Sequence, residues 1–168
     1  TGRARQMNVG AAASRSDVLL FLHADTSLPA QARVAIQRAL DESTCVGGRF
    51  DVRFEEDGTL SGVIGRMMNM RSRLTGIATG DQALFVRRDV FEQLGGFADI
   101  PLMEDIDFSR RLKRRGRIAA LDLQAVTSYR RWSARGPWRT IVLMWMLRSL
   151  FWLGISPHRL RHFYGTIR

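Results

Sequence analysis

The sequence has one cysteine, Cys45, and one lysine, Lys113, among its 168 residues. A lone cysteine excludes an internal disulfide framework and a cysteine metal cluster, so the chain suits a reducing compartment and Cys45 is interpreted as a core residue. Neither an internal repeat nor a low-complexity linker marks a domain boundary. The first residues, Thr1 to Asn8, lack an initiator methionine and the apolar run of a signal peptide, which predicts a start inside a longer chain.

Negative charge is also in short supply, because 26 basic residues face 16 acidic ones and the net charge is +10. Nearly all of the positive charge is arginine, whose planar guanidinium favours phosphate partners. Nucleic acid, an anionic membrane surface and a phosphate-bearing substrate are all compatible with this charge. Hydrophobic residues make up 45% of the chain, which is enough for one globular core.

Alternating strand and helix patterns predict a single α/β layer structure. The apolar run Val18–Leu22 predicts a strand buried on both faces in a sheet of parallel type, and the alternation over Val46–Phe54 predicts a half-exposed strand. Helical spacing over Leu60–Leu74 predicts a helix with methionines that fill the core. Its expected apolar stripe consists of Val63, Met67, Met70 and Leu74.

Carboxylates occur at two places where an α/β fold can use them. Asp25 closes the first predicted strand within His23-Ala24-Asp25, where it can reach an ion or can simply cap the next helix. Glu104, Asp105 and Asp107 lie at a predicted helix start, where the macrodipole favours their ionised form and lowers their pKa. They are candidates for a base at neutral pH or for ordinary helix capping.

Two further motifs can contact a polar ligand. Gly80-Asp81-Gln82 offers a close backbone and two hydrogen-bonding side chains for a polyhydroxylated ligand, although a plain turn explains it nearly as well. Arg130-Arg131-Trp132 combines guanidinium groups with an aromatic ring, which can bind a diphosphate beside a sugar or lipid chain. A solvated basic turn is the alternative.

In chain order, these motifs resemble family 2 glycosyltransferases. The residues that carry the resemblance are Gly2–Ala11, Phe21–Asp25, Gly80-Asp81-Gln82 with Arg87-Arg88, and Glu104-Asp105. The sequence looks most like the bacterial branch of radical-SAM- or selenodomain-associated transferases, whose chains also end in an Arg-Trp motif and an apolar helix. The resemblance spans essentially the whole chain.

The resemblance implies a GT-A fold, an α/β fold with a mixed sheet flanked by helices, that lacks its N-terminal strands here. Residues 1–136 would then be the C-terminal portion of the transferase domain, and 137–168 a C-terminal helical segment. It also implies a nucleotide-sugar donor, a divalent ion (Mg²⁺ or Mn²⁺), and inversion at the anomeric carbon by single displacement. This chain alone would have poor activity.

The resemblance assigns roles to individual residues. Asp25 matches the metal-binding Asp of the DxD motif, with His23 in place of the first Asp. Asp105 matches the catalytic base, and Glu104 would orient that base or the acceptor. We therefore expect the carboxylates of Asp25 and Asp105 to face one common cleft.

Other matched positions would bind donor or acceptor. Arg3 and Asn8 fall in the segment that lines the donor pocket, and further contacts would come from Gly80, Asp81, Gln82, Arg131 and Trp132. Arg131-Trp132 resembles the end of the Gln-x-x-Arg-Trp motif of processive relatives. Ser128 replaces the Gln of that motif, so polymer synthesis is not inferred.

The segment Pro137–Ile155 is strongly apolar and carries Trp138, Trp145 and Trp152. Its part from Thr140 to Ile155 is shorter than the ~20 apolar residues that span a bilayer, and Arg148 lies within it. An interfacial helix would bring the site to a lipid-linked acceptor at the inner face of the cytoplasmic membrane. A core helix or a homodimer helix is the alternative, and the protein is expected to be cytoplasmic.

Two other function classes stay open. The positive charge and interleaved aromatics suit a basic module that binds nucleic acid or membrane without catalysis. No recognised nucleic-acid motif is present, so nucleic acid is not the expected partner. A nucleotidyltransferase shares the metal, the phosphates and the α/β architecture, but its glycine-rich basic signature is not seen. Sugar, nucleotide and acceptor do not follow from the sequence.

Overall fold

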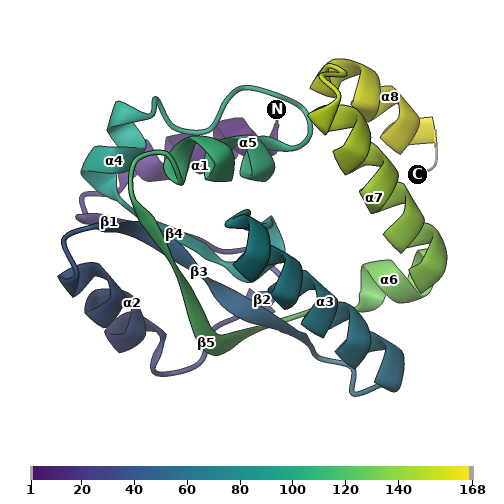
Figure 1. Cartoon of the computed structure of the whole chain (residues 1–168), viewed down its shortest axis with the longest axis horizontal. Coiled ribbons are helices and arrows are strands. Elements are labelled where there is room, and N and C mark those ends of the chain that lie inside the picture. The colour runs from purple at the N-terminus through teal and green to yellow at the C-terminus, as the bar shows by residue number, and fades with distance from the viewer. Residues whose placement is uncertain (1, 167–168) are drawn as a thin grey trace.

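The computed structural model describes residues 2–166, with residues 131, 135, 165 and 166 described only through their backbone. These residues form a five-stranded sheet with helices packed around it (Figure 1). β3 and β5 run parallel, whereas the pairs β1–β4, β4–β3 and β5–β2 are antiparallel. The sheet order is β1-β4-β3-β5-β2, with β1 (Val18–Phe21), β2 (Thr26–Ser27), β3 (Cys45–Phe54), β4 (Leu84–Arg87) and β5 (Arg117–Thr127). The predicted mixed sheet flanked by helices is confirmed.

Helices cover both faces of this sheet. They are α1 (Arg3–Ala13), α2 (Ala32–Asp41), α3 (Thr59–Thr75), α4 (Arg88–Gln93), α5 (Glu104–Leu112), α6 (Arg130–Arg135), α7 (Pro137–Trp152) and α8 (Pro157–Thr166), with a 3-10 turn, η1 (Gly80–Gln82). On one face, α1, α4 and α5 share a core with β1 and β4 that includes Ala4, Phe91 and Phe108. On the other face, α2 packs on β3 and β5 through Leu40 and Phe50.

The first strand differs from its prediction. β1 lies at the edge of the sheet, runs antiparallel to β4, and leaves Leu20 and Leu22 exposed. The expectation of a strand buried on both faces in a parallel sheet is therefore wrong. Residues of β1 instead line one side of a cleft.

The second predicted strand is more buried than expected, because β3 lies at the centre of the sheet. Arg49, which alternation placed on a solvated face, is only 2% exposed. Its guanidinium pairs with the carboxylate of Asp51, which also contacts Arg73 at 2.7 Å. Burial lowers the pKa of Arg49, whereas Asp51 acts in the opposite direction. Pairing lets a central strand carry charged residues.

Helix α3 forms as predicted, but its expected core stripe faces outward. Val63, Met67, Met70 and Leu74 are exposed, and the helix instead packs through small residues such as Ser61 and Gly65. Asn69 also joins the helix to β3. Its side-chain amide accepts a hydrogen bond from the N–H of Val52 and donates one to the C=O of Val52. Periodicity correctly predicted that Val63, Met67, Met70 and Leu74 share one face of the helix. That face was expected in the core, but it is exposed.

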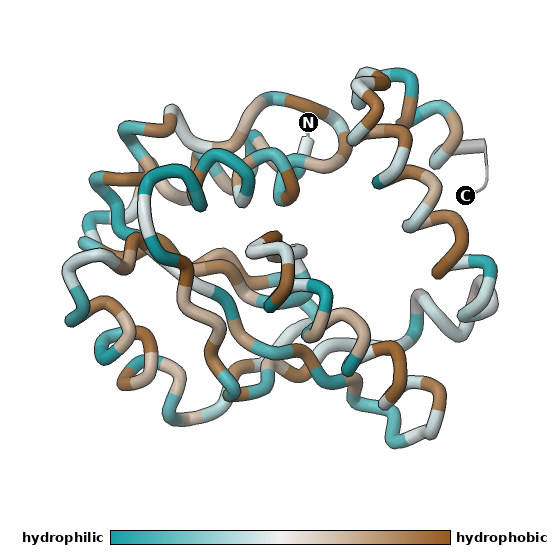
Figure 2. Tube along the Cα trace, viewed as in Figure 1, coloured by the Kyte–Doolittle hydropathy of each residue, from teal (hydrophilic) through white to brown (hydrophobic). Residues whose placement is uncertain are grey.

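The C-terminal helices α7 and α8 pack through Leu143, Leu147 and Leu160 against the loop and helix that carry Ile77 and Ile106. Figure 2 shows how hydrophobic residues recur along α7. Three tryptophans of α7 are exposed: Trp138, which is 70% exposed, Trp145 and Trp152. None of the helices in the described residues combines the length and hydropathy needed to cross a membrane.

Candidate active site

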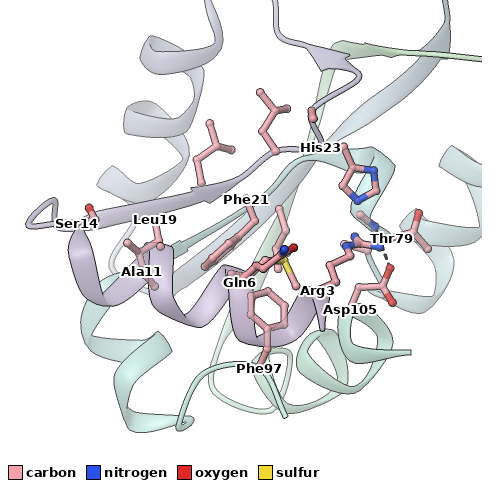
Figure 3. Close-up of a pocket in the computed structure, with 18 of the residues that line it drawn as sticks. Arg3, Gln6, Ala11, Ser14, Leu19, Phe21, His23, Thr79, Phe97 and Asp105 are labelled. Carbon is pink, nitrogen blue, oxygen red and sulfur yellow. Dashed lines mark hydrogen bonds between the residues drawn. The ribbon is translucent and has the colours of Figure 1, made fainter. Parts of the chain in front are cut away.

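A cleft of about 1060 Å³ lies between α1, β1, η1 and the start of α5 (Figure 3). The two carboxylates expected to share a cleft, Asp25 and Asp105, both line it. Arg3, His23 and Asp105 lie together at one end, whereas Ala11 and Ser14 lie at the other (Figure 3). The polar groups are therefore concentrated where the loop after β1 meets η1 and α5.

Asp105 is held by two backbone donors. Its Oδ2 accepts a hydrogen bond from the N–H of Gly80 at 2.9 Å, and its Oδ1 accepts one from the N–H of Ile106 at 2.8 Å. The helix-capping interpretation is thus partly correct, since one oxygen satisfies a free amide of the first turn. Asp107, two residues on, instead pairs with Arg111 at 2.8 Å and does not line the cleft.

Glu104 departs from the electrostatic prediction. The side chain is 5% exposed, and its pKa is raised, first by burial and then by the adjacent Asp105 carboxylate. Arg3, whose Nε lies 3.3 Å from Glu104 Oε1, lowers that pKa without outweighing the burial. The expected lowering by the helix dipole is wrong for this residue, because desolvation exceeds the modest effect of a helix terminus.

His23 lies opposite η1 and is oriented by it. Its Nδ1 is 3.0 Å from Asp81 Oδ1, and its Nε2 is buried without a hydrogen-bond partner among the described residues. Gly80 fits between His23 and Arg3 so closely that an added Cβ would meet the guanidinium of Arg3 and lie 2.6 Å from His23 Cε1. The glycine therefore allows an imidazole and a guanidinium to share one end of the cleft.

A divalent ion would find few ligands from the protein. The described residues hold no group of three His, Cys, Asp or Glu side chains suited to a metal. Mg²⁺ sites commonly use one or two carboxylates together with substrate phosphates. Asp25 is exposed at the cleft, and the unpartnered His23 Nε2 has the carboxylate-held arrangement typical of a ligating imidazole. An ion at either group would need further ligands, such as the oxygens of a diphosphate.

Some predicted ligand-binding residues have structural partners instead. Asn8 does not line the cleft, because its amide donates to the C=O of Phe97 at 2.8 Å and accepts from the N–H of Phe97 at 2.9 Å. Gln82 is fully buried and accepts from the N–H of Thr79 at 3.2 Å. Trp132 packs against Phe54, with ring centroids 5.9 Å apart, and it also lines a second cavity. The side chain of Arg131 lies outside the described residues.

A second cavity of about 380 Å³ adjoins this site. α3 and α7 form its walls, and Asp81, next to the cleft residue Gly80, also lines it. Arg71 and Arg148 line it as well, and the sequence analysis gave neither a role. The sequence feature that could have drawn attention to them is that each arginine interrupts an apolar helical segment. Arg130, which belongs to the motif expected to bind a diphosphate, lines the main cleft.

Comparison with known proteins supports the fold. No family model matches the sequence, and no curated protein matches it either. Among solved structures, the chain is similar to the mannosyltransferase PcManGT from Pyrobaculum calidifontis, determined in complex with GDP-Man and Mn²⁺, with a TM-score of 0.54 and 19% identity. The match covers 76% of this chain but 36% of that chain, so this chain spans about a third of its length. The chain therefore has the mixed α/β fold of a nucleotide-sugar transferase.

Proposed function

We propose that this chain transfers a sugar from a nucleotide-diphospho-sugar to an acceptor hydroxyl, with inversion by single displacement. The observation that carries the proposal is that Asp25 and Asp105 line one cleft in a fold similar to that of a nucleotide-sugar transferase. A donor diphosphate is a strong anion, and Arg3 and Arg130 line the same cleft. Guanidinium groups bind phosphate oxygens with paired, charge-assisted hydrogen bonds.

Asp105 is the proposed general base. The two backbone N–H bonds fix the orientation of its carboxylate, while each oxygen keeps a lone pair for an acceptor proton. The acceptor hydroxyl gives its proton to Asp105 as its oxygen bonds to the anomeric carbon. The bond from that carbon to the diphosphate oxygen breaks, and its electron pair leaves with the nucleoside diphosphate. Glu104 holds Arg3 in place by their ion pair.

Asp25 and His23 would hold Mg²⁺ or Mn²⁺ together with the donor diphosphate. When bound, such an ion neutralises negative charge on the leaving group. PcManGT was determined with Mn²⁺ and GDP-Man, which supports a divalent ion in this proposal. Asp81 supports His23 from the opposite ring nitrogen, which matches the way ligating imidazoles are commonly held.

The segment 137–168 has a second proposed role beside residues 1–136, which would form the transferase part. Trp138, Trp145 and Trp152 on α7 are exposed, although Trp145 also lines the cavity beside α3 and the guanidinium of Arg110 lies 4.5 Å from the ring centroid of Trp152. Aromatic side chains of this kind suit the interface of an anionic membrane. We therefore propose peripheral membrane contact through α7, with a homodimer contact through the same face as the alternative outcome.

The experiment that tests the transferase proposal is a turnover assay with a panel of nucleotide-sugars, each with Mn²⁺ or Mg²⁺. Release of nucleoside diphosphate identifies the donor, and NMR of the product reports the configuration at the anomeric carbon. The proposal expects inversion. Retained configuration would contradict single displacement, whereas salt-sensitive nucleic-acid binding without turnover on any donor would favour the basic-module alternative.

A further inference from the structure

The second cavity is an apolar groove with a cationic end. Large apolar side chains of α3 and α7 line it, and four of them are exposed: Met67, Met70, Leu74 and Trp145. Soluble proteins rarely leave such side chains together without a binding partner. The packing of α3 explains why they are free, because that helix is buried through other residues, namely Ser61, Ile64, Gly65 and Ser72.

Arg71 and Arg148 supply the charge. In Arg71 the Nε and Nη2 atoms are buried and have no hydrogen-bond partner among the described residues. Burial lowers the pKa of Arg71 to about 10, the nearby Arg148 acts in the same direction, and Asp105 and Asp81 oppose them. Unsatisfied guanidinium donors are costly inside a protein, and an anion would satisfy them. The groove thus combines walls for a hydrocarbon chain with donors for an anion.

The position of the groove relates this chemistry to the cleft. Gly80 and Asp81 are consecutive residues of η1, yet Gly80 lines the cleft and Asp81 lines the groove. The charges of Asp105, which lines the cleft, and of Arg71 and Arg148, which line the groove, lie close enough to affect one another. An anion bound by the two arginines would therefore lie within electrostatic reach of the proposed base.

We propose that this groove binds the acceptor, and that the acceptor is a phospholipid-type molecule in which a hydrocarbon chain is joined through a phosphate to a hydroxylated headgroup. The chain lies between α3 and α7, the phosphate contacts Arg71 and Arg148, and a headgroup hydroxyl reaches Asp105. The role as acceptor site rests on the proposed transferase function. The binding of the amphiphile rests on the groove alone.

Three soluble probes separate the components of this recognition. Lauroyl lysophosphatidylglycerol carries chain, phosphate and hydroxyls; monolaurin lacks the phosphate; and glycerol 3-phosphate lacks the chain. Trp132 and Trp145 line the groove, so a blue shift of tryptophan fluorescence reports binding below the micelle concentration. The wild-type chain should bind the lysophospholipid at least about tenfold more tightly than monolaurin, and glycerol 3-phosphate more weakly than either.

Two variants test the arginine. Arg71→Met should weaken lysophospholipid binding about tenfold or more while leaving the affinity for monolaurin unchanged. Arg66→Met is the matched control, because Arg66 is exposed on the same helix and does not line the groove, and it should bind like the wild type. If Arg71→Met fails to fold, as judged by its thermal transition, Arg148→Met replaces it with the same expected result.

Equal affinity for monolaurin and the lysophospholipid would overturn the proposal, as would an Arg71→Met variant that binds both like the wild type. If Arg66→Met lost as much affinity for the lysophospholipid as Arg71→Met, the loss would be an effect of net charge, and the proposal would also be overturned. Donor binding is followed separately, by thermal shift with the nucleotide-sugar panel. Donor binding without lipid binding refutes the groove proposal alone, and lipid binding without donor binding or turnover refutes the transferase proposal.

Discussion

Replacement of Asp105 by Asn tests the proposed base, and the structure predicts two separate effects. The Asn side chain keeps one carbonyl oxygen, whereas Asp105 accepts from both Gly80 and Ile106. One of these amides therefore loses its acceptor. A hydrogen bond to a charged group contributes about 1.5–3 kcal/mol. For a domain of this size, 1 kcal/mol corresponds to about 2–4 °C in Tm, so we expect a decrease of about 3–12 °C.

The effect on chemistry should be larger and independent of stability. Loss of a general base reduces the rate by about 10²–10⁴-fold, so turnover should fall by that factor at temperatures well below the transition. Asp107→Asn is the matched control, because Asp107 occupies the same helical turn but pairs with Arg111 outside the cleft. Full turnover in Asp105→Asn would refute the base assignment, and an unchanged Tm would contradict the account in which Asp105 accepts from both Gly80 and Ile106.

Three further predictions concern the residues around this base. The pKa of Glu104 is raised in the fold, so its stabilising contribution is present below the ordinary glutamate range and is lost as the pH rises through the raised pKa. The stability of Glu104→Gln relative to wild type should therefore increase as the pH rises above the ordinary glutamate range in urea titrations, and a constant difference would contradict this account. Gly80→Ala should displace Arg3 and weaken donor affinity about tenfold, whereas Gly62→Ala, where an added Cβ meets nothing, should not. Asn8→Ala should lower stability by about 1–3 kcal/mol and leave donor affinity unchanged, since its amide braces the loop after α4; a selective loss of donor affinity would restore its role as a ligand residue.

The alternation of strands and helices predicted the α/β class, whereas the mixed sheet was expected only from the resemblance to family 2 glycosyltransferases. The alternation did not predict which elements lie at the edge of the sheet. Val18–Leu22 is apolar enough for a central strand, yet β1 is an edge strand whose uncovered side chains line the cleft. The outward stripe of α3 was misassigned for a related reason: Asn69 lets a polar helix face pack on β3, and periodicity contains no information about that contact.

The site was predictable to the extent that its chemistry is local. The acidic helix start and the polar end of the first strand identified Asp25 and Asp105, and the fold brings both to one cleft. The raised pKa of Glu104 depends on burial and on the position of Arg3, which is distant in sequence. Arg71 and Arg148 were missed because their burial beside one another arises only when α3 and α7 come together.

The most direct test of the central claim compares donor binding by three forms of the full chain. Asp25 and Asp105 are proposed to act on one bound sugar diphosphate, Asp25 through an ion and Asp105 on the acceptor proton. With Mn²⁺, at least one nucleotide-sugar should raise the Tm of the wild type and of Asp105→Asn, but not that of Asp25→Ala. A Tm increase in Asp25→Ala equal to that of the wild type, or none in any form with any donor, would contradict a shared catalytic cleft.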